Sequence, residues 1–129
     1  MDNIKKKILI VEDETALLNI LYNKLTREGF EVLSANNGEE GLEMAIKNRP
    51  DLILLDIVMP VMDGITMLKK LRTESEWGKD VKVIMLTNLS DSEKVAEAVL
   101  YGFHSYLVKS DWKIEDVVKK VREKLVFNF

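Results

Sequence analysis

Hydrophobic positions along the chain form short continuous runs that alternate with longer periodic stretches. Four short apolar runs are typical of strands buried on both faces, because strands covered by helices on each side show continuous hydrophobicity. A fifth stretch alternates apolar and polar residues, as an edge strand does. The continuous runs are Ile8–Val11, Leu52–Leu55, Val81–Leu86 (with one Lys inside) and Tyr106–Val108, and the alternating stretch is Glu31–Ala35.

Between these strands the apolar spacing changes to that of amphipathic helices. The clearest stretch lies near the end of the chain, where Ile114, Val117, Val118, Val121 and Leu125 fall on one helical face. Each stretch of this kind makes a single apolar stripe. The stripes therefore predict helices that each pack one face against a sheet.

Local signals mark where these helices begin and end. Gly29 is expected to end the first helix, and the Asn-Arg-Pro segment at 48–50 to end the second. Ser90 and Glu93 form a capping box that would open the fourth helix. The chain is thus predicted to consist of five successive β-α units.

Strict β-α alternation with short links favours right-handed crossovers and a parallel sheet with helices on both faces. We predict an α/β fold: a doubly wound five-stranded parallel sheet of order 2-1-3-4-5, flanked by five helices in the flavodoxin-like arrangement. In this order the loops that leave strands 1 and 3 diverge and open a crevice at the carboxyl ends of the strands. Function is expected in that crevice.

Composition narrows the classes of function. The 129 residues fit one domain, 1–129, with a core at about 7–125. A net charge of −3 offers no cationic excess for direct nucleic-acid binding. The first apolar run is too short for a signal peptide or a membrane span, so we expect a cytoplasmic protein that does not enter a membrane. Without cysteine and with His104 as the single histidine, any metal would be hard and oxygen-bound.

Three carboxyl groups are expected to meet in the crevice. Glu12 and Asp13 follow the first strand directly, and Asp56 closes the third. Like charges crowded in this way need a cation, and Mg²⁺ (or Mn²⁺) is the simplest candidate. For any single acid the ordinary alternative is a helix N-cap, and Asp13 is placed to cap the helix that begins near Glu14.

Two further polar residues end the remaining strands. Thr87 lies at the end of the fourth strand and Lys109 at the end of the fifth. Alone, a strand-end threonine or a lysine is an ordinary residue. Together with the carboxylates they supply what an acyl-phosphate site needs: a hydroxyl that donates to one phosphoryl oxygen and an ammonium that neutralises another.

Five separated motif positions in this chain form a known pattern. In chain order the residues are Glu12-Asp13, Asp56-Ile57-Val58-Met59-Pro60 with Asp63-Gly64, Thr87, Tyr106 and Lys109. The pattern resembles the receiver domains of two-component response regulators, over about residues 7–125. The resemblance implies a phosphorelay protein that is not an enzyme in the usual sense but a phosphoacceptor signalling switch, which assists its own phosphorylation and dephosphorylation.

The resemblance also implies a ligand set and a partner. Asp56 would accept a phosphoryl group from the phosphohistidine of a sensor histidine kinase or a histidine phosphotransfer protein. Mg²⁺ would be held by Asp13, Asp56 and the main-chain carbonyl of Val58, with Glu12 acting through a bound water. No other cofactor is implied. The downstream target stays unknown, and a stand-alone protein and a piece of a longer regulator remain equally open.

The signal would leave the site through Thr87 and Tyr106. In the family, the threonine moves toward the phosphoryl group and an aromatic residue turns into the space it leaves. This movement repacks the face formed by the fourth helix, the fifth strand and the fifth helix, which is also a possible dimer surface. The alternative for Tyr106 is a plain strand aromatic, and the exposure of its ring separates the two.

Two loop positions give further expectations. Ser110 follows Lys109 where the family usually has a proline after a cis peptide bond, so we predict a trans bond there. Gly64 is expected to adopt a positive φ in the turn before the third helix.

Rival classes fit less well. Acids after the first strand would repel the phosphate of a flavin carrier, the glycines and lysine of a P-loop are missing there, and an aspartate-nucleophile phosphatase would need an acid at Val58. The remaining rival is a degenerate receiver that serves only as an interaction module.

Overall fold

The computed structural model describes residues 5–88 and 92–126. Its five strands form one parallel sheet of order β2-β1-β3-β4-β5. This is the predicted doubly wound topology. The elements are β1 (Lys7–Val11), α1 (Thr15–Arg27), β2 (Glu31–Ala35), α2 (Gly38–Asn48), β3 (Leu52–Asp56), α3 (Gly64–Glu74), the short 3₁₀ helix η1 (Trp77–Lys79), β4 (Lys82–Thr87), α4 (Ser92–Val99), β5 (Ser105–Val108) and α5 (Ile114–Val126).

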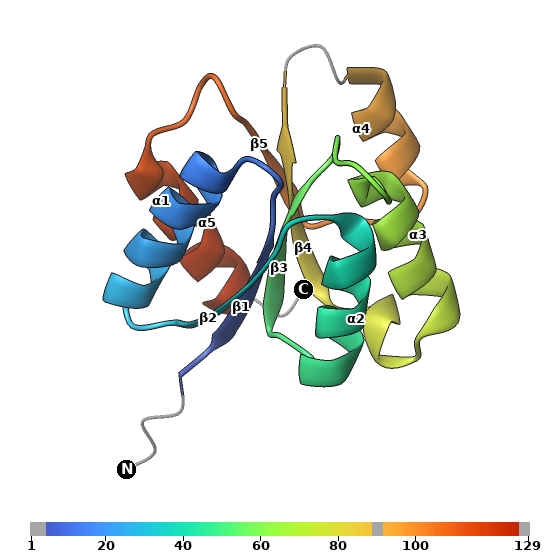
Figure 1. Ribbon diagram of the computed structural model, residues 1–129, viewed down its shortest axis with the longest axis horizontal. Coiled ribbons are helices and arrows are strands. Elements are labelled where there is room, and N and C mark those ends of the chain that lie inside the picture. The colour runs from blue at the N-terminus through green and yellow to red at the C-terminus, as the bar shows by residue number, and fades with distance from the viewer. Residues whose placement is uncertain (1–4, 89–91, 127–129) are drawn as a thin grey trace.

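The helices form two layers around the sheet. Helices α1 and α5 cover one face, and α2, α3 and α4 cover the other (Figure 1). Each face has its own apolar cluster, one centred on Ile8, Leu54 and Leu86 and the other on Leu9, Leu55 and Met85. Adjacent residues of one strand enter different clusters because successive side chains point to opposite faces of the sheet.

The burial of each strand agrees with its hydrophobic pattern. All residues of β3 are buried, whereas β2 at the sheet edge shows mixed burial. Strand pairing aligns Val11 with Leu55. The next residues along these neighbouring strands are Glu12 and Asp56, so the register itself brings the two acids to the same edge of the sheet.

Most predicted boundaries are confirmed. The first helix ends before Gly29, which has a φ of 98°, and the second ends at Asn48, followed by Arg49 with a φ of 46°. Strand β4 begins one residue after Val81, and η1 was not predicted. The proposed capping box depends on Ser90, which lies outside the described residues.

The expectation of a positive φ at Gly64 is wrong, because the described glycines in that region of conformational space are Gly29 and Gly102. Gly64 instead allows a close approach. A Cβ on it would collide with the main-chain carbonyl of Asp56, and its amide donates to the carbonyl of Ile57 at 2.8 Å. The glycine therefore closes the loop after β3 tightly beneath the acidic residue.

Among residues 5–88 and 92–126, no helix has the length and apolar character that crossing a membrane requires.

Candidate functional site at the carboxyl edge of the sheet

Three carboxylates meet where β1 and β3 end. Glu12, Asp13 and Asp56 each offer an oxygen within 4.8 Å of the others. Glu12 and Asp56 are buried, and Asp13 is exposed. The helix-cap alternative for Asp13 is wrong, because the N-cap residue of α1 is Glu14, whose own side chain makes no capping hydrogen bond.

Lys109 lies across this acidic cluster. Its Nζ is 2.8 Å from Oε1 of Glu12 and 3.0 Å from Oδ1 of Asp56. Burial alone would lower the pKa of Lys109, but hydrogen bonds and charge interactions with both acids outweigh burial and raise it. The side chain is therefore a firmly charged ammonium. Its position follows from β5, since the Lys109 amide donates to the carbonyl of Thr87 at 2.6 Å, and the Lys109–Ser110 bond is trans as predicted.

The pKa of Asp56 reflects its burial and the charges of its neighbours. Burial, followed by the negative charge of Glu12, raises the pKa of Asp56 to about 7, while Lys109 acts in the opposite direction. The ammonium of Lys109 does not offset the combined effect of burial and of repulsion by Glu12. A site of this kind gains stability from an additional cation.

The donor set fits a hard divalent ion. Oε1 of Glu12 is fully buried and lies 2.8 Å from the ammonium of Lys109. Carboxylate oxygens are the ligands that Mg²⁺ and Mn²⁺ prefer. The observed cluster therefore agrees with the predicted acidic metal site.

Thr87 and Tyr106 border a separate cavity beside the site. Thr87 is buried, and its hydroxyl donates only a long hydrogen bond, 3.5 Å, to the carbonyl of Leu107. The Tyr106 side chain is 51% exposed and meets the ring of Phe103 edge-on. A cavity of about 380 Å³ lies between α4 and β5, lined by Thr87, Asn88, Ser92, Val95, Ala96, Tyr106 and Val108.

Sequence reasoning missed the position of one acid. Oε1 of Glu14 lies 3.9 Å from Nζ of Lys109, at the exposed rim of the site. The Glu14 amide donates to Oε2 of Glu12 at 3.0 Å, which ties the start of α1 to the buried acid. The run of three acids from Glu12 to Glu14 was the available signal, but a sequence does not show which of them faces the lysine.

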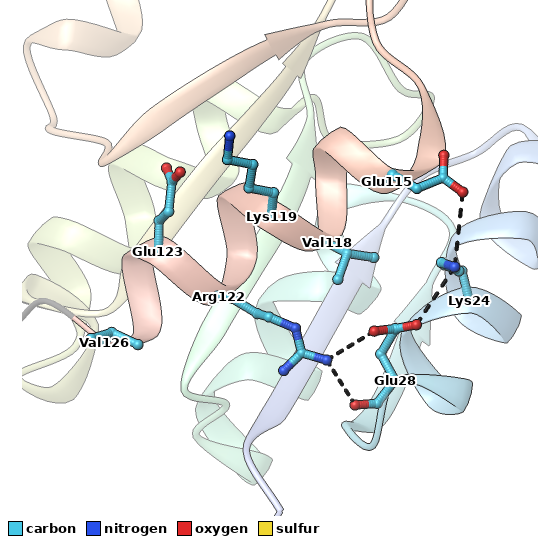
Figure 2. Close-up of a pocket in the computed structure, with 8 residues that line it drawn as sticks. All are labelled: Lys24, Glu28, Glu115, Val118, Lys119, Arg122, Glu123 and Val126. Carbon is cyan, nitrogen blue, oxygen red and sulfur yellow. Dashed lines mark hydrogen bonds and ion pairs between the residues drawn. The ribbon is translucent and has the colours of Figure 1, made fainter.

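A larger groove, of about 540 Å³, lies between α1 and α5 and contains none of the predicted site residues (Figure 2). Two ion pairs cross it: Glu28 accepts from Arg122 at 2.9 Å, and Lys24 pairs with Glu115 at 4.0 Å. Arg122 also lies over the ring of Phe30, 5.1 Å from its centre. These contacts hold the two helices together on the side of the sheet that α1 and α5 cover.

A doubly wound parallel sheet with clustered acids and a lysine at its carboxyl edge defines a receiver-type signalling domain. Comparison with known proteins agrees. Residues 8–122 match the family model of the response regulator receiver domain, and the chain belongs to this family of two-component signalling switches.

Individual relatives support the assignment. The probable transcriptional regulator ycf27 of Porphyra purpurea is 42% identical over 109 residues, which cover 84% of this chain and 43% of that protein. The chain thus spans less than half of this relative. The chemotaxis response regulator CheY4 of Vibrio cholerae is 32% identical, with a TM-score of 0.85 and coverage of 93% of this chain and 98% of that one.

One similar structure carries a metal. The receiver domain of the sensor histidine kinase PA1611 from Pseudomonas aeruginosa PAO1 is 25% identical, with a TM-score of 0.86 and coverage of 96% of this chain and 100% of that one. That structure has a magnesium ion coordinated in its active-site cleft.

Proposed function

We propose that this protein accepts a phosphoryl group on Asp56 from a phosphohistidine and changes the shape of its α4-β5-α5 face in response. The observation that carries the proposal is the pairing of a buried Asp56 with Lys109 inside a cluster of three carboxylates. A purely interaction-based module would have no need to bury charges that repel one another.

The metal would be held by Asp13, Asp56 and the Val58 main-chain carbonyl, with Glu12 acting through a water. When bound, Mg²⁺ would supply positive charge that keeps the carboxylates ionised and neutralises phosphoryl oxygens. The Mg²⁺ reported for the PA1611 receiver domain supports this assignment by similarity.

Phosphoryl transfer would use the carboxylate of Asp56 as the nucleophile. One of its oxygens forms a bond to phosphorus as the bond from phosphorus to the imidazole nitrogen breaks, and the departing nitrogen keeps the electron pair. Lys109, already 3.0 Å from Asp56, stabilises negative charge on the transferring oxygens. The later loss of phosphate to water would use the same residues.

The new phosphoryl oxygens would attract the hydroxyl of Thr87, whose present hydrogen bond of 3.5 Å is easily exchanged. The ring of Tyr106, half exposed at present, would then turn into the cavity of about 380 Å³ beside Thr87. Movement of the ring changes the surface between α4, β5 and α5. A switch of this kind converts the added charge on Asp56 into a change in the packing of the α4-β5-α5 face.

The partner on the input side would be a sensor histidine kinase or a histidine phosphotransfer protein. On the output side, the name of the ycf27 relative suggests an effect on transcription through a further domain or a partner protein. Pairing of two copies through the α4-β5-α5 face is a candidate way of passing the signal.

Incubation with Mg²⁺ and acetyl phosphate, followed by intact mass measurement, tests the proposal. The unmodified protein should gain the mass of one phosphoryl group, and Asp56→Asn should gain none. Beryllofluoride should change the tryptophan fluorescence of the unmodified protein but not that of Asp56→Asn. Labelling that survives in Asp56→Asn would disprove the assignment of the acceptor.

The switch needs its own variant. Thr87→Ala should still be phosphorylated but should lose the phosphorylation-dependent burial of Tyr106, measured as protection of its ring from chemical modification. Equal protection of Tyr106 in both proteins would contradict the coupling.

A further inference from the structure

Glu14 faces the site without belonging to the proposed metal cluster or the proposed chemistry. Its side chain is 67% exposed, and its Oε1 lies 3.9 Å from Nζ of Lys109. Its main chain is fixed on both sides, because its amide donates to Glu12 and its carbonyl accepts from Leu18 at 2.9 Å. The side chain therefore starts from a fixed position at the rim of the crevice.

This position has an electrostatic consequence. Lys109 is the cation that would receive phosphoryl oxygens, and two of its acidic partners, Glu12 and Asp56, lie beneath it in the buried part of the site. Glu14 approaches the same ammonium from the solvent side. Any phosphodonor that comes close to Asp56 meets this negative charge, and the repulsion grows in proportion to the charge of the donor.

We propose that Glu14 is a specificity-determining residue that selects against small, highly charged phosphodonors. The proposal rests on the proposed function of Asp56. Acetyl phosphate is a dianion at neutral pH, whereas phosphoramidate is a monoanion and carries the P–N bond that phosphohistidine also has. A negative rim disfavours the first donor more than the second, so we expect the site to react more slowly with small, highly charged acyl phosphates than its chemistry with Asp56 alone would allow.

The experiment compares second-order rate constants for phosphorylation by the two donors at saturating Mg²⁺. At low ionic strength, Glu14→Gln should raise the rate constant about fivefold for acetyl phosphate and about twofold for phosphoramidate, since the effect scales with donor charge. Both increases should shrink in high salt because exposed charges are screened.

Three controls separate charge from structure. Glu14→Asp keeps the charge and should stay close to the unmodified protein. Glu76→Gln removes an acid that is also exposed and paired with a lysine, 3.0 Å from Lys79, but lies beside η1 at the amino end of β4. It should change neither rate. The dissociation constant for Mg²⁺, followed by tryptophan fluorescence, should differ less than about threefold between Glu14→Gln and the unmodified protein, because the substituted carboxylate is exposed and outside the acidic cluster.

The inference would be overturned if Glu14→Gln changed the rate constants for both donors by the same factor, or changed neither. It would also be overturned if Glu14→Asp behaved like Glu14→Gln. A much larger loss of Mg²⁺ affinity would also overturn it, because Glu14 would then act through the metal. Failure of the proposed function looks different: neither donor would label Asp56 in the unmodified protein.

Discussion

Replacement of Asp56 by asparagine should stabilise the metal-free protein, although it removes the proposed acceptor. Burial and the charge of Glu12 raise the pKa of Asp56 from 3.8 to about 7. Each pKa unit corresponds to about 1.4 kcal/mol, so the ionised carboxylate costs the metal-free fold at most about 4 kcal/mol. Removal of the carboxylate recovers this free energy only in part, because Lys109 loses one of its two buried acidic partners. We expect a net stabilisation of about 2 kcal/mol above pH 7.

The sign of the pH dependence follows from the direction of the pKa change. Between pH 3.8 and about 7 the unfolded chain loses the Asp56 proton while the folded protein keeps it, so rising pH destabilises the fold. The asparagine side chain of the variant has no proton to lose. The stability difference between Asp56→Asn and the unmodified protein should therefore be small at pH 4.5 and reach its full value at pH 8.

Urea denaturation with EDTA at the two pH values measures this difference. Addition of Mg²⁺ at pH 8 should stabilise the unmodified protein more than the variant, because only the unmodified protein keeps the carboxylate at position 56. A variant that is less stable than the unmodified protein at pH 8, or a difference independent of pH, would refute the electrostatic account of the site.

Three further predictions concern other parts of the fold. His104→Asn should keep an acceptor for the Val83 amide, which now donates to Nδ1 of His104 at 3.2 Å. Because burial, followed by the charge of Arg72, lowers the pKa of His104, the unmodified protein should lose stability as the pH falls from 6.5 through the folded pKa, and urea titrations should show a weaker loss in the variant. Gly64→Ala should destabilise the protein by about 2–4 kcal/mol, measured by urea denaturation, because its methyl group meets the Asp56 carbonyl. Arg72→Lys should cost about 2–3 kcal/mol in the same assay, since a lysine does not reproduce the guanidinium contacts to the carbonyls of Tyr101, Gly78, Val81 and Gly102.

The fold was predictable because hydrophobic period and strand order constrain each other. Continuous apolar runs such as Leu52–Leu55 require cover on both faces, and alternation with helices leaves few ways to provide it. Once the order 2-1-3-4-5 is accepted, Glu12 and Asp56 must meet at one edge of the sheet. The positions of Glu12 and Asp56 at the ends of their strands were therefore enough to predict that the two acids lie close together.

Features that depend on tertiary contact were not predictable. The positive φ expected at Gly64 was a local inference, but the glycine is required by a main chain that passes close to it. Val61 instead adopts the left-handed region, with a φ of 68°, although it is β-branched and 76% exposed. The Met62 amide donates to the carbonyl of Pro60 at 2.7 Å and so closes a tight turn around Val61. The conformational preference of valine does not predict this turn.

The buried carboxylates of the site reduce the stability of the fold but favour binding of a cation. A protein selected for stability alone would replace Glu12 or Asp56 with an apolar residue, because buried carboxylates repel one another. If the cation binds where that repulsion is greatest, part of its binding free energy comes from the relief of the repulsion. The metal-free protein is then less stable than a variant with a neutral residue at this position, and the cation gains affinity from the difference. Stabilisation by Asp56→Asn and Mg²⁺ binding by the unmodified protein are, on this account, two measurements of one electrostatic quantity.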